Sequence, residues 1–405
     1  MASRISAHRD GLRPENAILL DLRPGVARLD DIALEATDAL RSLEALGHPR
    51  PILLACYPPG PSPFYSLLYA RALECGVAPI PIRTIADAAA LVPIAAVDGA
   101  RVVLHLHWLY KVLEGVTNPA EGWRRVAEFE AELDRLLERS VAIVWTVHNI
   151  LPHDAGLPEC ELTLRRAVVA RASAIHVMAE ATESILAPDL LLPTGRVFRV
   201  PHPAFTGVYP DWVDRPHARR VLGIPPSVPA IGLIGSLRPY KGLADLLDAL
   251  PALTLRRAGI RLVVAGDVGS VSDMEETIDR AIAEPRVLIH PRHIPDDRIQ
   301  DLMRGLDAVV LPYQRVLNSA ALMLALAFDR PVVFPRDPAL AEFADPALAV
   351  TYDRGSSDAL AEAIDRVLAL PPDDVVNATR RFCATRDPAV LSRSFAMELQ
   401  ERIVV

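Results

Sequence analysis

The sequence predicts an α/β protein made of two doubly wound domains, and three observations lead to this prediction. Apolar runs of strand length alternate with amphipathic helical patterns, without the turn signals of hairpins, which is typical of parallel sheets covered on both faces. The chain has 405 residues, and a domain usually takes about 100–200 residues. Hydrophobic residues make up 51% and charged residues 23% of the sequence, which is enough for two large cores.

Composition also excludes several classes of function. The net charge of −8 gives no basic footprint, so nucleic acid is not an expected partner. The four cysteines lie far apart without a Cys-x-x-Cys pair, which argues against a zinc site or a disulfide framework. The N-terminus lacks the apolar core of a signal peptide, and no apolar run approaches the roughly 18 residues of a membrane span. We therefore expect a cytoplasmic protein and leave peripheral contact with the inner face of a membrane open.

The elements of the first half follow in order from these patterns. Apolar runs predict strands at residues 16–22, 51–56, 101–107, 141–147, 174–178 and 196–200. Amphipathic spacing predicts helices at 30–46, 64–75, 122–140 and 161–171, with Gly47 and Gly76 ending the first two. A stretch poor in pattern follows up to about residue 221.

The second half repeats the alternation more regularly. Strands are expected at 229–235, 260–266, 286–290, 307–312 and 331–334, with a weaker one at 348–351. Helices are expected between them at 242–256, 273–283, 296–305 and 319–328, and three more follow at 357–369, 373–384 and 388–401. We predict domains at 1–205 and 206–387, and a last helix within 388–405 that crosses back onto the first domain.

The stretch 231–242 joins a buried strand to a helix through a tight turn. Such a junction places backbone N–H groups and the positive end of a helix dipole at one point. Arg238 and Lys241 lie in the turn and add two cations. The junction therefore predicts a phosphate or diphosphate site; the alternative is an ordinary loop with two solvated cations.

A second junction of this kind lies at 311–320. A buried strand ends at Pro312, a polar loop follows, and Asn318-Ser319 opens an apolar helix. Asn and Ser suit a helix N-cap, which is a purely structural explanation. The functional interpretation is a second helix N-terminus directed at the same diphosphate.

Together these junctions resemble the nucleotide-sugar glycosyltransferases of the GT-B fold, especially family 4 (glycosyl transferases group 1) and related bacterial exopolysaccharide enzymes. The matching residues are Gly235, Arg238, Lys241 and Gly242 in the turn, and the strand–loop–helix that ends in Asp329-Arg-Pro-Val-Val. The resemblance covers roughly residues 230–335 well and the first half only by architecture. It implies two Rossmann-like domains facing a cleft, the first for the acceptor and the second for the donor.

The resemblance also implies the ligands. The donor would be a nucleoside-diphosphate sugar, UDP- or GDP-linked, with no cofactor and no bound metal, and nothing in the sequence has metal-ligand spacing. The loop after strand 286–290 is where this fold meets the nucleobase. The donor-binding residues carried over to this chain are Gly235, Arg238, Lys241, His293, Asn318, Ser319 and Ala320.

One departure from the family pattern bears on the donor site. Family 4 enzymes usually carry two glutamates eight positions apart that contact the donor ribose and sugar. Alignment on Pro331 places Val316 and Leu324 at those positions. The chain therefore resembles a divergent branch in which Asn-Ser-Ala replaces a Gly-Phe-Gly-type loop, and retention or inversion of the anomeric centre does not follow from this loss.

Four histidines gather in two loops at the carboxyl ends of first-half strands, namely His105, His107, His148 and His153. His105 and His107 share a strand face, because side chains alternate along a strand. An inverting transfer needs a base that deprotonates the acceptor hydroxyl, and we predict Asp154 for this role, with His153 as the rival. We predict that His148 contacts the donor sugar or phosphate.

His107 and Trp108 are the predicted acceptor-binding residues, since aromatic rings suit the faces of sugars. The alternative for each histidine is a structural hydrogen bond, and for Trp108 it is buried packing.

The favoured function is transfer of a hexose from a nucleotide sugar to a saccharide or lipid-linked saccharide, in polysaccharide or glycolipid biosynthesis. One alternative is a nucleotide-sugar epimerase or sugar phosphorylase on the same fold, because a shared fold does not fix chemistry. Another is a non-catalytic nucleotide-binding homologue, which the missing glutamates would suit. The sequence names neither the sugar, nor the base, nor the acceptor.

Overall fold

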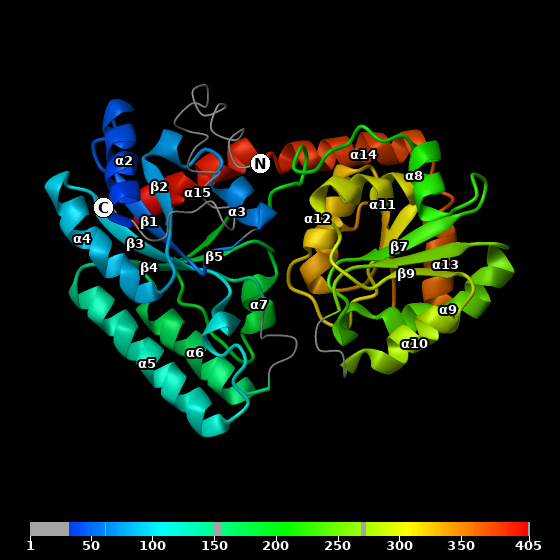
Figure 1. Cartoon of the computed structure of the whole chain (residues 1–405), viewed down its shortest axis with the longest axis horizontal. Coiled ribbons are helices and arrows are strands. Elements are labelled where there is room, and N and C mark those ends of the chain that lie inside the picture. Colours follow the sequence, from blue (N-terminus) through cyan, green and yellow to red (C-terminus); the bar gives the residue numbers. More distant parts are fainter. Residues whose placement is uncertain (1–31, 61, 150–155, 269–272, 404–405) are drawn as a thin grey trace, which may run out of the picture. The chain divides into compact units, whose positions relative to one another are not determined.

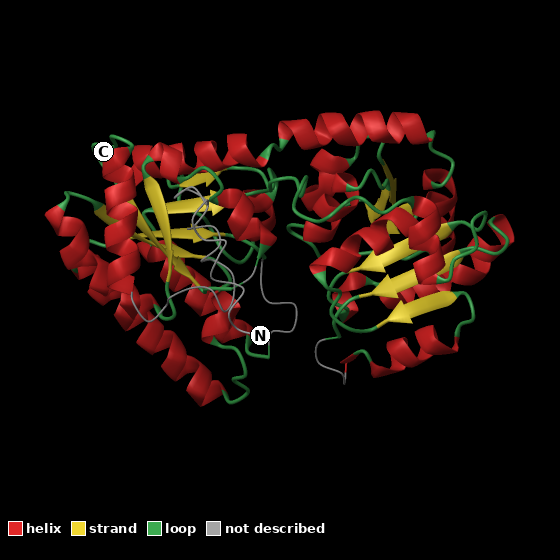
Figure 2. Cartoon of the chain, turned by 45° about the horizontal axis from the view of Figure 1, so that its top comes forward, coloured by secondary structure: helices red, strands yellow, loops and turns green. Residues whose placement is uncertain are grey.

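The computed structural model describes residues 32–60, 62–149, 156–268 and 273–403, which form two compact units (Figure 1). The first unit contains the described residues up to Met178, then Thr182–Pro203 and the chain from Pro388 onward. The second unit contains Ala179–Ala181 and Ala204–Asp387. Each unit is built around one parallel sheet with helices packed on it (Figure 2).

The sheet of the first unit has six parallel strands in the order β2-β1-β3-β4-β5-β6. Its inner strands are buried almost throughout, as expected where helices cover both faces. The strands are β1 (Ile52–Tyr57), β2 (Val77–Pro81), β3 (Arg101–Leu106), β4 (Ala142–Thr146), β5 (Ala174–Val177) and β6 (Val197–Arg199).

Helices cover both faces of this sheet. One face packs against α2 (Ile32–Ala45), α4 (Ala88–Val97), α5 (Pro119–Glu138) and α6 (Pro158–Arg171). The other face packs against α3 (Pro63–Leu68) and α15 (Pro388–Ile403), the last helix of the chain. Phe395 and Leu399 of α15 are fully buried in this core.

The second unit has a sheet of six parallel strands in the order β12-β11-β10-β7-β8-β9. The strands are β7 (Ala230–Ile234), β8 (Arg261–Ala265), β9 (Val287–His290), β10 (Ala308–Val310), β11 (Val332–Pro335) and β12 (Ala349–Tyr352). Helices α9 (Leu243–Arg256), α10 (Glu275–Ala283) and α13 (Ser357–Val367) pack on one side. Helices α8 (Arg215–Leu222), α11 (Ile299–Gly305), α12 (Ala320–Ala327) and α14 (Pro372–Thr385) complete the unit.

The expected fold class is confirmed, and each strand expected within the described residues is present with small shifts at its ends. The strand expected at 16–22 lies outside the described residues. Three elements of the first unit, β2, α4 and α7 (Thr182–Leu186), were not predicted. β2 contains Pro79 and Pro81, so its sequence does not have the pattern of a strand. It is an edge strand, where the missing N–H of proline is tolerated.

Two further predictions need correction. The helix expected at 64–75 ends at Leu68, and a separate 3-10 turn, Leu73–Cys75, then leads into Gly76. The stretch before residue 222 contains helix α8, which begins with the Asp214 carboxylate accepting the N–H of His217 at 2.8 Å. Asp214, a residue type that favours helix N-caps, is the local sequence feature from which α8 could have been predicted.

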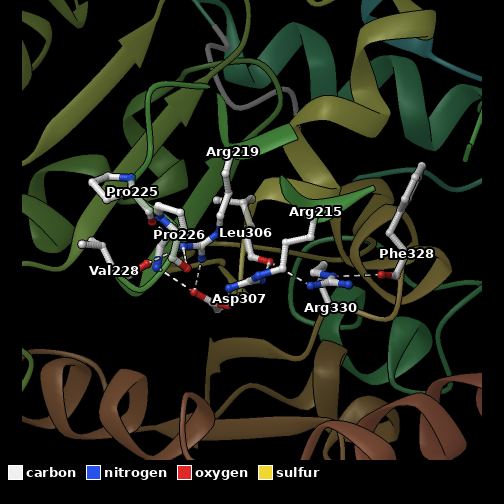
Figure 3. Close-up of polar contacts among 10 residues, drawn as sticks. Arg215, Arg219, Pro225, Pro226, Val228, Leu306, Asp307, Phe328 and Arg330 are labelled. Atoms are coloured by element: carbon white, nitrogen blue, oxygen red, sulfur yellow. Dashed lines mark hydrogen bonds and ion pairs between the residues drawn. The ribbon is translucent and has the colours of Figure 1, made fainter. Parts of the chain in front are cut away.

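A partly buried ion network fixes the amino ends of β7 and β10 (Figure 3). Asp307 accepts from both Arg215 and Arg219, and it also accepts the Ala230 N–H at 2.8 Å. Arg219 is 2% exposed and donates in addition to three carbonyls of the loop 225–228. Because open α/β sheets bind ligands at the opposite edge, we interpret this network as structural.

No helix in the described part of the chain is both long enough and apolar enough to span a bilayer.

Candidate functional site

A cavity of about 440 Å³ lies in the second unit, where β7 and β8 end. Its walls are the ends of these strands and the turn after β7 (234–236, 240–241 and 265–267), the loop 293–299, and the start of α12 (318–321) with Leu324. Phe205 and Tyr209 close another side. The carboxyl edge of a parallel sheet is where α/β folds usually bind ligands.

Glycines allow the backbone segments around the cavity to meet. A Cβ on Gly266 would lie 2.0 Å from the carbonyl oxygen of Gly235. A Cβ on Gly242 would lie 1.9 Å from the carbonyl oxygen of Pro312, and Gly242 also has a φ of +75°. The turn before α9 and the loop after β10 can approach this closely only because Gly242, the turn residue at the contact, has no side chain.

Lys241 is the cation of the cavity. Its Nζ lies 5.4 Å from the centre of the Tyr240 ring and 4.7 Å from that of Tyr313. Burial lowers the pKa of this lysine. Among the ion pairs of the described residues none involves Lys241, whereas the other lysine, Lys111, pairs with Glu114. A partly desolvated ammonium group held by two rings is suited to an anion that binds from the cavity.

Tyr313 connects Lys241 to the start of α12. The Lys241 ammonium donates to the Tyr313 hydroxyl at 3.4 Å, and that hydroxyl lies 2.8 Å from Ser319 Oγ. Ser319 Oγ caps α12 by accepting the N–H of Leu322 at 3.1 Å. The two junctions that the sequence singled out therefore meet through one buried tyrosine.

The structure brings most of the predicted donor-binding residues together, and their role in binding stays a prediction. Arg238 is the exception, because it does not line the cavity and donates to the Leu237 carbonyl at 3.2 Å. At the positions of the family glutamates, Leu324 lines the cavity and Val316 is buried. The predicted residues that line it are Gly235, Lys241, His293, Asn318, Ser319 and Ala320.

Sequence reasoning missed several cavity residues. Tyr313 follows the end of β10 by a few positions, and that proximity was its only local signal. Asp296 and Asp267 are exposed carboxylates in the wall of the cavity. Burial raises the pKa of Tyr209 to about 12, and the charge of Asp296 adds to this shift.

In the first unit His105, His107 and His148 lie at the carboxyl end of the sheet. His105 and His107 do share a face of β3, since both bond to the Tyr69 hydroxyl, through His105 Nδ1 at 2.7 Å and His107 Nε2 at 2.8 Å. His107 Nδ1 also lies 2.9 Å from Nε2 of His148. The half-buried ring of His148 stacks on Trp108 at a centroid distance of 4.6 Å.

Two further residues extend this arrangement deeper into the sheet. Thr146 Oγ1 lies 2.7 Å from His105 Nε2 and 2.9 Å from His176 Nδ1. His176 Nε2 in turn lies 2.8 Å from the Val200 carbonyl oxygen. Neither Thr146 nor His176 stood out in the sequence, because each lies inside an apolar strand.

The surroundings keep these imidazoles neutral. Burial lowers the pKa of His105, His107 and His148, and the neighbouring imidazoles lower it further. Burial also lowers the pKa of His176, to about 4. Because both ring nitrogens of the 1%-exposed His107 have protein partners, any acceptor contact at this position would have to be made by Trp108 or His148.

His153 and Asp154, the predicted candidates for the general base, lie outside the described residues. Within the described part of the chain, no group of three or more histidine, cysteine or acidic side chains is arranged to hold a metal ion.

Comparisons with known proteins extend these findings. Residues 228–369 match the family described as "Glycosyl transferases group 1". Over 292 residues the chain is 27% identical to a GDP-mannose:glycolipid 4-beta-D-mannosyltransferase of Xanthomonas campestris pv. campestris, covering 69% of this chain and 75% of that protein.

Two solved structures show the same fold. The Anabaena protein HepE in complex with UDP aligns over 87% of this chain and 100% of its own, with a TM-score of 0.61 and 16% identity. Sucrose-phosphate synthase from Thermosynechococcus elongatus aligns over 88% and 99%, with a TM-score of 0.65 and 15% identity. Together with the two six-stranded parallel sheets, these matches show a glycosyltransferase with the GT-B fold, whose residues 228–369 match the group 1 family.

Proposed function

We propose that this glycosyltransferase moves a hexose from a nucleoside-diphosphate sugar to a lipid-linked saccharide, with the donor bound by the second unit and the acceptor by the first. The observation that carries the donor assignment is Lys241, a partly desolvated cation in a cavity of about 440 Å³ between two helix starts. Such a cavity is suited to a diphosphate because it offers fixed positive charge and backbone N–H groups.

The leaving diphosphate is the group that the cavity must stabilise, since negative charge develops on it as the sugar departs. Tyr313 accepts a hydrogen bond from Lys241, so its own proton points to Ser319 Oγ. Ser319 Oγ then accepts from Tyr313 and from the N–H of Leu322, and its hydroxyl proton remains for a phosphate oxygen. Arg238 is the second cation of the turn and reaches a diphosphate only if its side chain swings away from Leu237.

The acidic wall of the cavity supports a guanine base rather than uracil. Asp296, beside Tyr209, and Asp267 are exposed carboxylates there. Guanine presents N1–H and the N2 amino group side by side, so a carboxylate can accept from both, whereas uracil presents one N–H between two carbonyl oxygens. The Xanthomonas relative uses GDP-mannose, which agrees with a GDP-linked donor.

The acceptor is proposed to be lipid-linked because that same relative acts on a glycolipid. Such an acceptor would be met at the inner face of a membrane, through peripheral contact of a cytoplasmic enzyme. The stacked pair Trp108–His148 offers the sugar a ring surface and a polar edge. Asp154 and His153 remain the proposed candidates for the base, and no cofactor besides the donor is required.

A thermal-shift screen against GDP, UDP, ADP, dTDP and CMP tests the donor assignment. GDP should raise the melting temperature most, because a ligand that binds only the folded state stabilises it. Replacing Lys241 with Met should remove the shift, since loss of one such charge contact costs about 2–4 kcal/mol. Lys111→Met is the matched control and should keep it, because Lys111 lies on the surface of the first unit, paired with Glu114.

Product analysis then separates the alternatives. Transfer of the hexose to a lipid-linked saccharide supports the proposal. Interconversion of the nucleotide sugar without an acceptor would instead identify an epimerase, and sugar phosphate formed from inorganic phosphate would identify a phosphorylase. Nucleotide binding with no turnover of any kind would indicate a non-catalytic homologue.

A further inference from the structure

A single file of hydrogen bonds runs through the core of the first unit and ends at the Val200 carbonyl. Its links measure 2.7–2.9 Å, and every member except the half-buried His148 is fully buried. The members, which we call the histidine chain, are in order His148, His107, Tyr69, His105, Thr146 and His176.

The end of the histidine chain dictates the direction of every bond in it. The Val200 carbonyl can only accept, so His176 donates from Nε2, and a neutral His176 must then accept at Nδ1 from Thr146. The Thr146 oxygen is thereby left to accept from Nε2 of His105.

The same rule applies along the rest of the chain. With its proton on Nε2, His105 accepts at Nδ1 from the Tyr69 hydroxyl. The Tyr69 oxygen then accepts from Nε2 of His107, and His107 Nδ1 accepts from Nε2 of His148. Since each member has one donor and one acceptor in the chain, reversing any single bond would leave two donors or two acceptors facing each other.

The neighbours of the chain are consistent with neutral members. Phe395 of α15 stacks on His105 at 5.2 Å and lies edge-on to His176 at 5.2 Å, so an apolar ring seals this side. The titratable groups that act on the chain are the Cys56 thiol and the Tyr65 phenol near Tyr69, and the His202 imidazole near His148 and His176. Burial raises the pKa of Cys56 to about 12, so its thiol is also uncharged at neutral pH.

We propose that the histidine chain is a positioning device that holds His148 as the tautomer with its proton on Nε2, so that its Nδ1 can only accept. The aligned bonds also turn their lone pairs toward His148, because each member accepts from the His148 side and donates toward Val200. In acid–base catalysis a carboxylate usually plays this orienting part behind a histidine.

The catalytic meaning of this device rests on the proposed function, in which His148 contacts the sugar substrates. There, Nδ1 of His148 would accept a hydrogen bond from a sugar hydroxyl, and the Nε2 proton would stay on His148, donated to Nδ1 of His107. The Val200 carbonyl cannot take up or release a proton, so the chain orients and polarises His148 and does not carry protons away.

Nitrogen NMR of the full chain labelled with ¹⁵N-histidine tests the tautomers directly. At neutral pH, His148, His107, His105 and His176 should each show a protonated Nε2 and an unprotonated Nδ1. A protonated Nδ1 on a neutral His148 would overturn the proposal. This readout needs no substrate, so it stands even if the proposed transfer reaction is wrong.

Variants of Thr146 test whether the chain imposes the tautomer. Thr146→Val removes the hydroxyl and keeps the shape, so His148 should begin to sample both tautomers and its two nitrogen signals should move toward each other. Thr146→Ser restores the hydroxyl and should restore the wild-type spectrum. An unchanged His148 spectrum in Thr146→Val would show that local contacts set the tautomer and would overturn the proposal.

Tyr69→Phe offers a second break in the chain with a closely matched control. Tyr65 is also buried and stacks on Tyr69 at 5.9 Å, but its hydroxyl donates to the Pro58 carbonyl outside the chain. Tyr69→Phe should lower kcat by roughly tenfold or more, a share of the 10²–10⁴ that acid–base groups supply, with little change in the KM for the donor. Tyr65→Phe should retain kcat. An equal loss of kcat in both variants would show that Tyr69 only packs in the core and would overturn its role in the histidine chain.

Discussion

Lys241 is one of only two lysines among the 43 lysines and arginines of the chain. In a sequence that otherwise uses arginine for positive charge, a lysine between Tyr240 and Tyr313 is a specific choice. An ammonium group is compact enough to fit between two rings, and its pKa responds to burial far more readily than that of a guanidinium group. Both properties suit a charge that is to be paired only when ligand is present.

Because the chain has only two lysines, the lowered pKa of Lys241 can be measured directly. Reductive ¹³C-methylation should give two lysine signals, besides that of the N-terminus, and we expect that of Lys241 to titrate at a lower pH than that of Lys111. A saturating nucleoside diphosphate should raise the pKa of Lys241, because the bound anion favours the charged form. If the nucleotide binds and the Lys241 titration does not move, the diphosphate is held elsewhere.

Individual residues were predictable from the sequence where the signal was local. The Arg238–Gly242 turn and the Ser319 cap lie within short motifs, and the structure has both features. Tyr69 could not be predicted, because its partners His105 and His107 are 36 and 38 positions away. Thr146 was hidden for the same reason, since a single polar residue at a strand end has no periodic signal.

At the scale of elements, the network around Asp307 joins helix α8 to the amino ends of β7 and β10. Replacing Asp307 with Ala should lower the free energy of unfolding by about 3 kcal/mol, because Arg219 would stay buried without its counter-ion. Denaturant unfolding measures this loss.

The matched control is the exposed pair Arg336–Asp353, whose side chains are 66% and 77% exposed. Asp353→Ala should cost at most about 1 kcal/mol, since exposed ion pairs contribute little. Similar losses of unfolding free energy in Asp307→Ala and Asp353→Ala would mean that the network around Asp307 contributes no more to stability than an exposed ion pair.

Element prediction succeeded best where strands are central and failed at edges and short helices. The inner strands are continuous apolar runs, which predict buried parallel strands almost regardless of context. β2 contains two prolines and is acceptable only because the sheet ends there. α3 stops at Leu68 although the apolar spacing continues, and this places Tyr69 in a turn beside the histidines.

At the scale of the whole molecule, the buried histidines predict how stability depends on pH. The pKa values of His105, His107 and His176 are lowered by burial, that of His176 to about 4, whereas an unfolded chain titrates near pH 6.5. Between these values the unfolded state takes up protons that the folded state does not. These three histidines should therefore leave the free energy of unfolding level from about pH 7.5 to about pH 8 and lower it below about pH 6.5, by up to about 1.4 kcal/mol per pH unit for each histidine.

Urea unfolding monitored at several pH values checks this profile. His217 is exposed, so His217→Gln should reproduce the wild-type pH dependence. A stability that stays constant from about pH 7.5 to about pH 5.5 would contradict neutral burial of the three histidines.

The two-domain α/β architecture followed from the alternation of apolar runs and amphipathic helices, and it is confirmed. That the first unit binds the acceptor and the second binds the donor stays a prediction. Donor chemistry was predictable because charge and helix starts meet within one segment. The polar residues gathered at the carboxyl end of the first sheet were not predictable as a group, because they come from four separate elements.

The path of α15 has a consequence for the order in which the protein is made. The described part of the first unit begins with α2 at Ile32, yet its core contains Leu391, Phe395 and Leu399 from α15. A ribosome must therefore finish the second unit before the first can bury its own apolar face. Until then the site of α15 over β5 is uncovered during translation, so the half that is synthesised earliest is the half that completes its folding last.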